Sequence, residues 1–186
     1  QMEPGGVTWN TPSAHRLHGP MDEQAFERAF AEMVRRQASL RTILVEEADG
    51  PVQKVLDRVE APLLPPVDLS QLPEPERMRR LMADLEAQTA EPFELDRGPL
   101  FRARLYRLGA DDHVLYFMTH HAIWDGWSFD VFYSEMSALY EAFAAGRPSP
   151  LPPLETSYGD YAAWRQQALD GEESARQLAH WKRHLD

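Results

Sequence analysis

The sequence contains no cysteine, so it can form neither a disulfide framework nor a metal site built on thiolates. It also lacks an apolar run long enough to cross a membrane, and its first residues do not resemble a signal peptide. These absences predict a cytoplasmic protein.

Basic residues are scarce in this chain. It has 19 lysines and arginines against 30 aspartates and glutamates, which gives a formal net charge of −11. Nucleic-acid binding needs clusters of basic side chains that neutralise phosphates, so this balance argues against nucleic acid as a partner. With 186 residues, of which 43% are hydrophobic, the chain is long and apolar enough for one domain with a substantial core.

Apolar residues recur at both helical and strand spacing, which indicates a mixed fold. Helical spacing predicts helices at residues 22–37, 76–90, 129–145, 158–169 and 172–185, the first of them capped by Asp22. Apolar runs and turn signals predict strands at residues 7–18, 40–46, 51–56, 99–108 and 113–119, with 40–46 and 51–56 forming one hairpin and 99–108 and 113–119 another. The proline-rich residues 60–75 are predicted to cross the surface without regular structure. The expected fold class is α+β, a mixed or antiparallel sheet packed with helices.

One corner between a predicted strand and a predicted helix carries an unusual set of polar residues. Two adjacent histidines, His120 and His121, are followed by Asp125 and Gly126. Neighbouring residues of an extended segment point to opposite sides, so only one histidine can face a cleft while the other packs inward. Such a histidine could transfer a proton at working pH. Asp125 could brace the loop by pairing with a backbone amide or an arginine.

Two further residues of the corner have expected backbone roles. Gly126 would let the backbone turn sharply or approach a ligand closely. Ser128 is predicted to cap the helix that follows.

The run from His120 to Ser128, His-His-Ala-Ile-Trp-Asp-Gly-Trp-Ser, resembles the HHxxxDG(W)S signature of condensation domains in nonribosomal peptide synthetases, which belong with the chloramphenicol acetyltransferase-like acyltransferases. The resemblance extends over essentially the whole chain. Segments similar to those of the family occur in the same order at Trp9-Asn10-Thr11-Pro12, residues 16–22, residues 36–42, residues 92–95 and residues 98–102.

The resemblance implies that residues 1–186 form the N-terminal one of two lobes, without the family's opening segment and without the C-terminal lobe. It implies an acyltransferase that moves an acyl or peptidyl group from an upstream carrier-protein thioester to the amino group of an aminoacyl thioester on a downstream carrier. No cofactor is expected on this chain, because the carriers deliver both substrates on phosphopantetheine arms. The expected partners are the two carrier proteins and the C-terminal lobe, and one lobe alone is expected to be inactive.

The resemblance also implies roles for individual residues. His121 stands at the family's catalytic position, as a general base or as a group that positions the amine, and His120 would support the loop. Asp125 would form a structural salt bridge, with Arg36 or Arg41 as its partner; both lie in a segment similar to the family's RHxxLRT, in which Gln37 replaces the usual histidine. Gly126 could direct its backbone N–H toward the substrate, an oxyanion-type role.

Related domain types and alternative functions would require different residues in this motif. Heterocyclisation domains have aspartates in place of both histidines, and epimerisation domains differ after the glycine, so the order Trp127-Ser128 favours condensation. One alternative keeps the fold without activity, as a recruitment platform for tailoring enzymes or carrier proteins; such domains tend to have a damaged motif. A metal site of His120, His121 and Asp125 is the other alternative, although adjacent histidines seldom converge on one ion.

Overall fold

The computed structural model describes residues 6–60, 62–169 and 171–185. The chain divides into two compact units, residues 1–152 and residues 153–186. The first unit contains the sheet and the motif, and the second contains two helices. None of the helices in the described residues is long and apolar enough to span a membrane.

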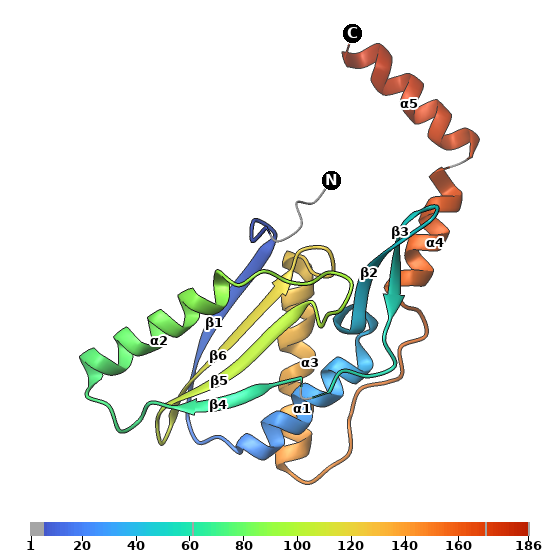
Figure 1. The fold of residues 1–186 in the computed structure, drawn as a ribbon. Helices are drawn as coiled ribbons and strands as arrows, with labels where there is room; N and C mark the ends of the chain where they lie inside the picture. Colours follow the sequence, from blue (N-terminus) through green and yellow to red (C-terminus); the bar gives the residue numbers. More distant parts are fainter. Residues whose placement is uncertain (1–5, 61, 170, 186) are drawn as a thin grey trace. The chain divides into compact units, whose positions relative to one another are not determined.

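A four-stranded sheet is the centre of the first unit (Figure 1). Its strands are β1 (Asn10–His18), β4 (Leu64–Asp68), β5 (Phe101–Gly109) and β6 (Asp112–His120), in the spatial order β1-β6-β5-β4. β6 pairs antiparallel with both β1 and β5, and β4 pairs parallel with β5, so the sheet is mixed. This confirms the predicted α+β class and the hairpin formed by β5 and β6.

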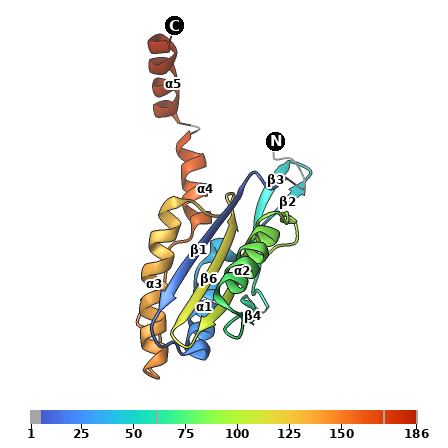
Figure 2. The same cartoon turned by 90° about the vertical axis from the view of Figure 1, so that its left-hand side faces the viewer.

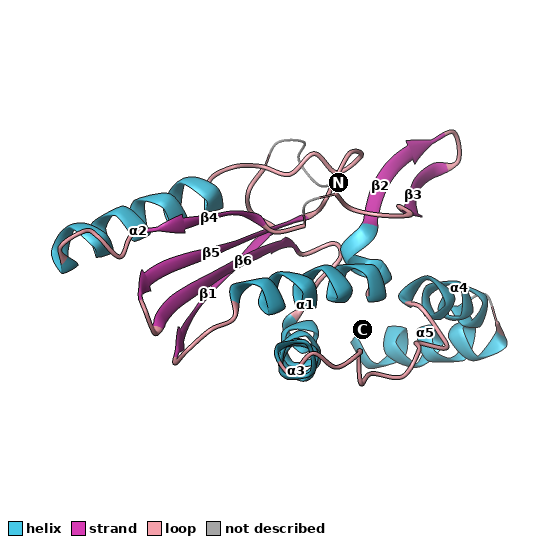
Figure 3. Ribbon diagram, turned by 90° about the horizontal axis from the view of Figure 1, so that it is seen from below, coloured by secondary structure: helices cyan, strands magenta, loops and turns pink. Residues whose placement is uncertain are grey.

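Helices cover both faces of this sheet. α1 (Glu23–Arg36) and α3 (Gly126–Ala144) lie on one face and α2 (Glu74–Thr89) lies on the other, as Figures 2 and 3 show. Because side chains of a strand alternate between faces, β6 divides its residues between the two layers. Phe117 stacks on Phe132 of α3, whereas the Tyr116 hydroxyl meets Thr89 of α2. β6 therefore lies in the middle of the core.

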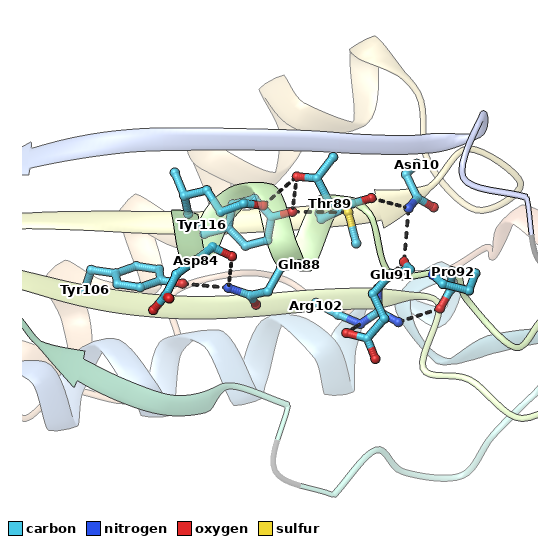
Figure 4. Close-up of polar contacts among 11 residues, drawn as sticks. Asn10, Asp84, Gln88, Thr89, Glu91, Pro92, Arg102, Tyr106 and Tyr116 are labelled. Atoms are coloured by element: carbon cyan, nitrogen blue, oxygen red, sulfur yellow. Dashed lines mark hydrogen bonds and ion pairs between the residues drawn. The ribbon is translucent and has the colours of Figure 1, made fainter. Parts of the chain in front are cut away.

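The end of α2 is fastened to the sheet by hydrogen bonds (Figure 4). Gln88 donates to the Tyr106 hydroxyl at 2.6 Å, and the hydroxyls of Thr89 and Tyr116 lie 2.9 Å apart. The side-chain amide of Asn10, at the start of β1, donates to the carbonyls of Thr89 and Glu91. These bonds link the first residue of β1 to the end of α2.

Residues 38–75 contain one hairpin that the sequence predicts and one strand that it does not. The hairpin of β2 (Thr42–Glu47) and β3 (Gly50–Val55) is confirmed, and a short 3₁₀ helix (Ala38–Arg41) precedes it. The prediction that residues 60–75 lack regular structure is wrong, because they contain β4. Pro65 and Pro66 cannot donate to a neighbouring strand, and β4 accommodates them at the edge of the sheet, where one side needs no partner.

Helices α4 (Tyr158–Leu169) and α5 (Glu172–Leu185) form the second unit. Their boundaries are those that the helical spacing of the sequence predicts.

Candidate active site at the end of β6

The two histidines of the motif differ in environment, as the alternation of the strand predicts. His120 is the last residue of β6 and only 4% exposed, and its ring meets Phe93 edge to face. Its Nδ1 accepts a hydrogen bond from the backbone N–H of Ala122 at 3.1 Å. His121 follows the end of the strand, and its side chain is exposed. The structure therefore gives His120 a packing role and leaves His121 open to solvent.

The environment of His120 favours its neutral form. Burial lowers the pKa of His120 below the ordinary value of 6.5, and the neighbouring His121 lowers it further. The hydrogen bond to Nδ1 agrees with this, because a protonated Nδ1 could no longer accept it.

The folded state should therefore lose stability when the pH is low enough to protonate His120. Because the folded pKa is lowered, the unfolded chain binds more protons, and stability present above pH 6.5 is lost as the pH falls below that value. We expect the free energy of unfolding, measured by urea denaturation across this range, to fall with pH, and His120→Asn to weaken that dependence. The same substitution at the exposed His180 is the control. An unchanged pH dependence in His120→Asn would contradict the expectation.

The loop after the histidines is anchored by two apolar side chains. Ile123 and Trp124 are 9% and 6% exposed. The indole of Trp124 packs edge to face on Phe117, Phe129 and Phe132, which places it between the sheet and α3. The loop is therefore part of the core layer, and the position of His121 is determined by packing on its C-terminal side.

Asp125 caps α3. Its carboxylate accepts hydrogen bonds from the backbone N–H of Ser128 at 2.9 Å and from the Ser128 hydroxyl at 2.6 Å, and the Ser128 hydroxyl in turn faces the backbone N–H of Asp125 at 3.3 Å. These reciprocal contacts form a capping box. The prediction that Ser128 is the N-cap is wrong by three residues: the helix begins at Gly126 and Asp125 is its cap.

The predicted ion pair between Asp125 and Arg36 or Arg41 is also wrong. Arg36 is nearly buried and binds the carboxylate of Glu135 in the middle of α3, at 3.2 Å, and Gln37 binds the same carboxylate at 2.7 Å. Glu135 lies about 15 Å along the helix from Asp125, at 1.5 Å per residue. Asp125 instead satisfies the unpaired N–H groups and the positive end of the helix dipole where α3 begins.

Arg41 has a separate structural role. Its guanidinium donates to the carbonyls of Val34 and Leu56, so it links the end of α1 to the end of β3. Both arginines therefore hold elements of the first unit together, and neither reaches the motif through Asp125.

Because Asp125 is an exposed helix cap, removing its side chain should lower the free energy of unfolding only slightly. Asp125→Ala is expected to lower the free energy of unfolding by about 1 kcal/mol, the usual cost of a lost N-cap, while Asp125→Asn should retain most of the stability. The bonds from Ser128 lower the pKa of Asp125 below 3.8, so this stabilisation should persist at neutral pH and disappear as the pH falls through the lowered pKa. Chemical denaturation measures both variants. A loss of roughly 3 kcal/mol or more, the size expected when a buried ion pair is broken, would contradict the exposed cap.

Gly126 is the first residue of α3, in a backbone conformation that any residue can adopt. The expectation that it permits a sharp turn is therefore wrong. An added Cβ would meet no atom within 4 Å, so the glycine leaves open space beside the start of the helix. Its backbone N–H is one of those at the helix N-terminus, where partial positive charge favours a developing negative charge.

Sequence reasoning missed two residues that the structure places near the motif or its helix. Glu135, the partner of Arg36, lies in α3, and the residues around it in the sequence do not predict this ion pair. Trp9 lies about 110 positions before His121, and only the pairing of β1 with β6 brings them together. Within the described ranges, no group of three His, Cys, Asp or Glu residues is arranged to hold a metal ion.

Comparison with known proteins identifies the family of this chain. A family model described as the condensation domain matches residues 1–186. The chain therefore belongs to the condensation domain family. Chondramide synthase cmdD of Chondromyces crocatus is 41% identical over 188 residues, covering 100% of this chain and 5% of that protein.

Two solved structures illustrate the range of the family. The first condensation domain of the calcium-dependent antibiotic synthetase, in complex with substrate analogue 2a, is 27% identical with a TM-score of 0.80, over 96% of this chain and 42% of its own. The X-domain in its complex with OxyB from teicoplanin biosynthesis is 31% identical with a TM-score of 0.81, over 95% of this chain and 38% of its own. The chain thus spans less than half the length of either structure.

Proposed function

We propose that residues 1–186 form the N-terminal, histidine-bearing lobe of a condensation domain that makes peptide bonds in nonribosomal peptide biosynthesis. The observation that carries the proposal is that the two histidines of the complete motif lie in different environments. His120 is buried, and His121 is exposed at the end of the central strand. This leaves the histidine at the family's catalytic position free to meet a substrate. The relationship to peptide synthetases such as the chondramide synthase supports the same reaction.

The proposed step transfers an acyl group from sulfur to nitrogen. The neutral amine of the downstream aminoacyl thioester attacks the carbonyl carbon of the upstream thioester, the C–N bond forms and the C–S bond breaks. The proton lost by the nitrogen passes to the departing thiolate. The imidazole of His121 would accept that proton or hold the amine by a hydrogen bond, and the N–H of Gly126 would face negative charge that develops on the carbonyl oxygen.

The proposed partners follow from the substrates. Upstream and downstream carrier proteins would bring the two thioesters on phosphopantetheine arms, so the chain needs no cofactor of its own. A C-terminal lobe would face this one and enclose a tunnel in which the two substrates meet, since the solved relatives are more than twice as long as this chain. We propose a cytoplasmic location, where loaded carriers are available.

A second candidate is a platform that recruits a tailoring enzyme, and the similarity to the X-domain bound to OxyB is the observation in its favour. The complete HHxxxDG motif favours catalysis over this alternative. The distinguishing experiment supplies both loaded carriers to the intact protein and follows the dipeptidyl thioester by mass spectrometry. Product that depends on His121 supports the enzyme, whereas absence of product with stable binding of a tailoring enzyme supports the platform.

A further inference from the structure

Among residues 6–60, 62–169 and 171–185, none gives the imidazole of His121 a hydrogen-bonded support. Catalytic histidines usually have one ring nitrogen held by a carboxylate or a carbonyl, which fixes the orientation of the ring. Here, no described residue forms a hydrogen bond with either ring nitrogen of His121. Asp125, the nearest candidate in sequence, directs its carboxylate to Ser128 at the start of α3. Any restraint on the rotation of this ring would therefore have to come from another contact.

Trp9 makes the contacts that could do so. Its carbonyl accepts a hydrogen bond from the backbone N–H of His121 at 2.8 Å, and its indole meets the His121 imidazole edge to face, with ring centroids 6.0 Å apart and planes at 90°. The perpendicular arrangement is one of the favoured geometries for aromatic pairs. One residue thus holds both the backbone and the ring of His121.

Trp9 is itself held in place from the other side. Asn10 pairs with His120 in the register of β1 and β6, and its side chain donates to the carbonyls of Thr89 and Glu91 at the end of α2 (Figure 4). The chain before it turns back, with the N–H of Asn10 bonded to the carbonyl of Val7. The backbone that carries the indole is therefore fixed relative to β6.

The indole contributes little to the core, since half of its surface is exposed, whereas the aromatic residues beneath the motif are almost fully buried. A large apolar side chain kept partly in solvent beside a histidine at the catalytic position points to a role at the site. From these contacts we infer that Trp9 is a positioning residue for His121: it sets the orientation in which the imidazole meets the amine. The inference builds on the proposed function.

Kinetics on the intact protein test the inference. Trp9→Ala should lower kcat with saturating loaded carriers by about tenfold or more, because small misplacements of a reacting group are costly. KM for the carriers should stay close to the wild-type value, and Trp9→Phe should restore most of kcat because it keeps an aromatic edge. Val7→Ala, which removes an exposed apolar side chain from the same segment, is the matched control and should leave kcat unchanged.

A chemical readout separates this inference from the proposed function. Diethyl pyrocarbonate modifies accessible imidazoles, and peptide mass spectrometry gives the rate at each histidine. In Trp9→Ala the rate at His121 should rise. The rate at His18, the last residue of β1, whose side chain is 69% exposed, should not change. Unchanged kcat in Trp9→Ala, or an unchanged rate at His121, would overturn the inference. A different result would separate the two claims. If His121→Ala remained active, but the modification rate at His121 still rose from the wild type to Trp9→Ala, the proposed function would fail and the Trp9–His121 contact would stand.

Discussion

The variant His121→Ala of the intact protein is expected to lose nearly all amide formation while retaining its fold. The attacking nitrogen must shed a proton as the new bond forms, and a general acid or base at this point contributes about 10²–10⁴-fold to the rate. His121 is the only exposed histidine of the motif, and nothing in the core depends on its side chain. Turnover of carrier-bound substrates, followed by mass spectrometry, measures the loss.

Stability measurements provide the control for this result. Because the imidazole of His121 is exposed, His121→Ala should melt close to the wild-type temperature, whereas His120→Ala removes a buried ring and should melt lower. Near-normal turnover by folded His121→Ala would exclude both the general-base and the positioning role.

The 186-residue chain by itself is expected not to catalyse condensation, although its motif is complete. We expect the substrates to meet between this lobe and a second one, as proposed above, and this chain spans only 42% of the solved condensation domain with the substrate analogue. On a single lobe, water would compete for every hydrogen bond to His121. Nothing would hold the amine against the thioester, and that orientation can be worth about 7–11 kcal/mol of barrier in the best cases.

The purified chain, supplied with both loaded carriers, tests this expectation by mass spectrometry of the dipeptidyl thioester. The intact protein at equal concentration is the positive control. Product at a comparable rate that is lost in His121→Ala would show that one lobe is sufficient. In that case the second lobe would serve to bind carriers and would add nothing to the chemical step.

The parts of this molecule that the sequence predicts well are those with strong local patterns. The central hairpin and helices α1 and α3 follow from apolar periodicity, and the opposite directions of His120 and His121 follow from the geometry of a strand. β4 was missed because two prolines obscure a strand that is tolerated only at a sheet edge.

The partners of charged residues proved harder to predict than the elements that carry them. Asp125 was expected to reach an arginine, yet the residue three positions later satisfies it, and the pattern Asp125-x-x-Ser128 could have indicated a capping box. The pair Arg36–Glu135 joins two helices that are far apart in sequence. The contact of Trp9 with His121 likewise joins two distant segments, the residues just before β1 and just after β6. Such pairs depend on packing angle and strand register, which a single sequence does not report.

The backbone at the motif has a consequence for how the site moves. The N–H groups of His120 and His121 donate in opposite directions, to the carbonyls of Leu100 and Trp9. Two consecutive amides are thus tied to the chain on each side of β6. β6 ends at His120, and the ends of elements open more readily than their centres, so these two bonds restrain a place where the strand could otherwise fray. His121 therefore combines a solvent-exposed imidazole with a main chain that both neighbouring segments hold, so we expect the motion that admits substrate to come from the surrounding loops.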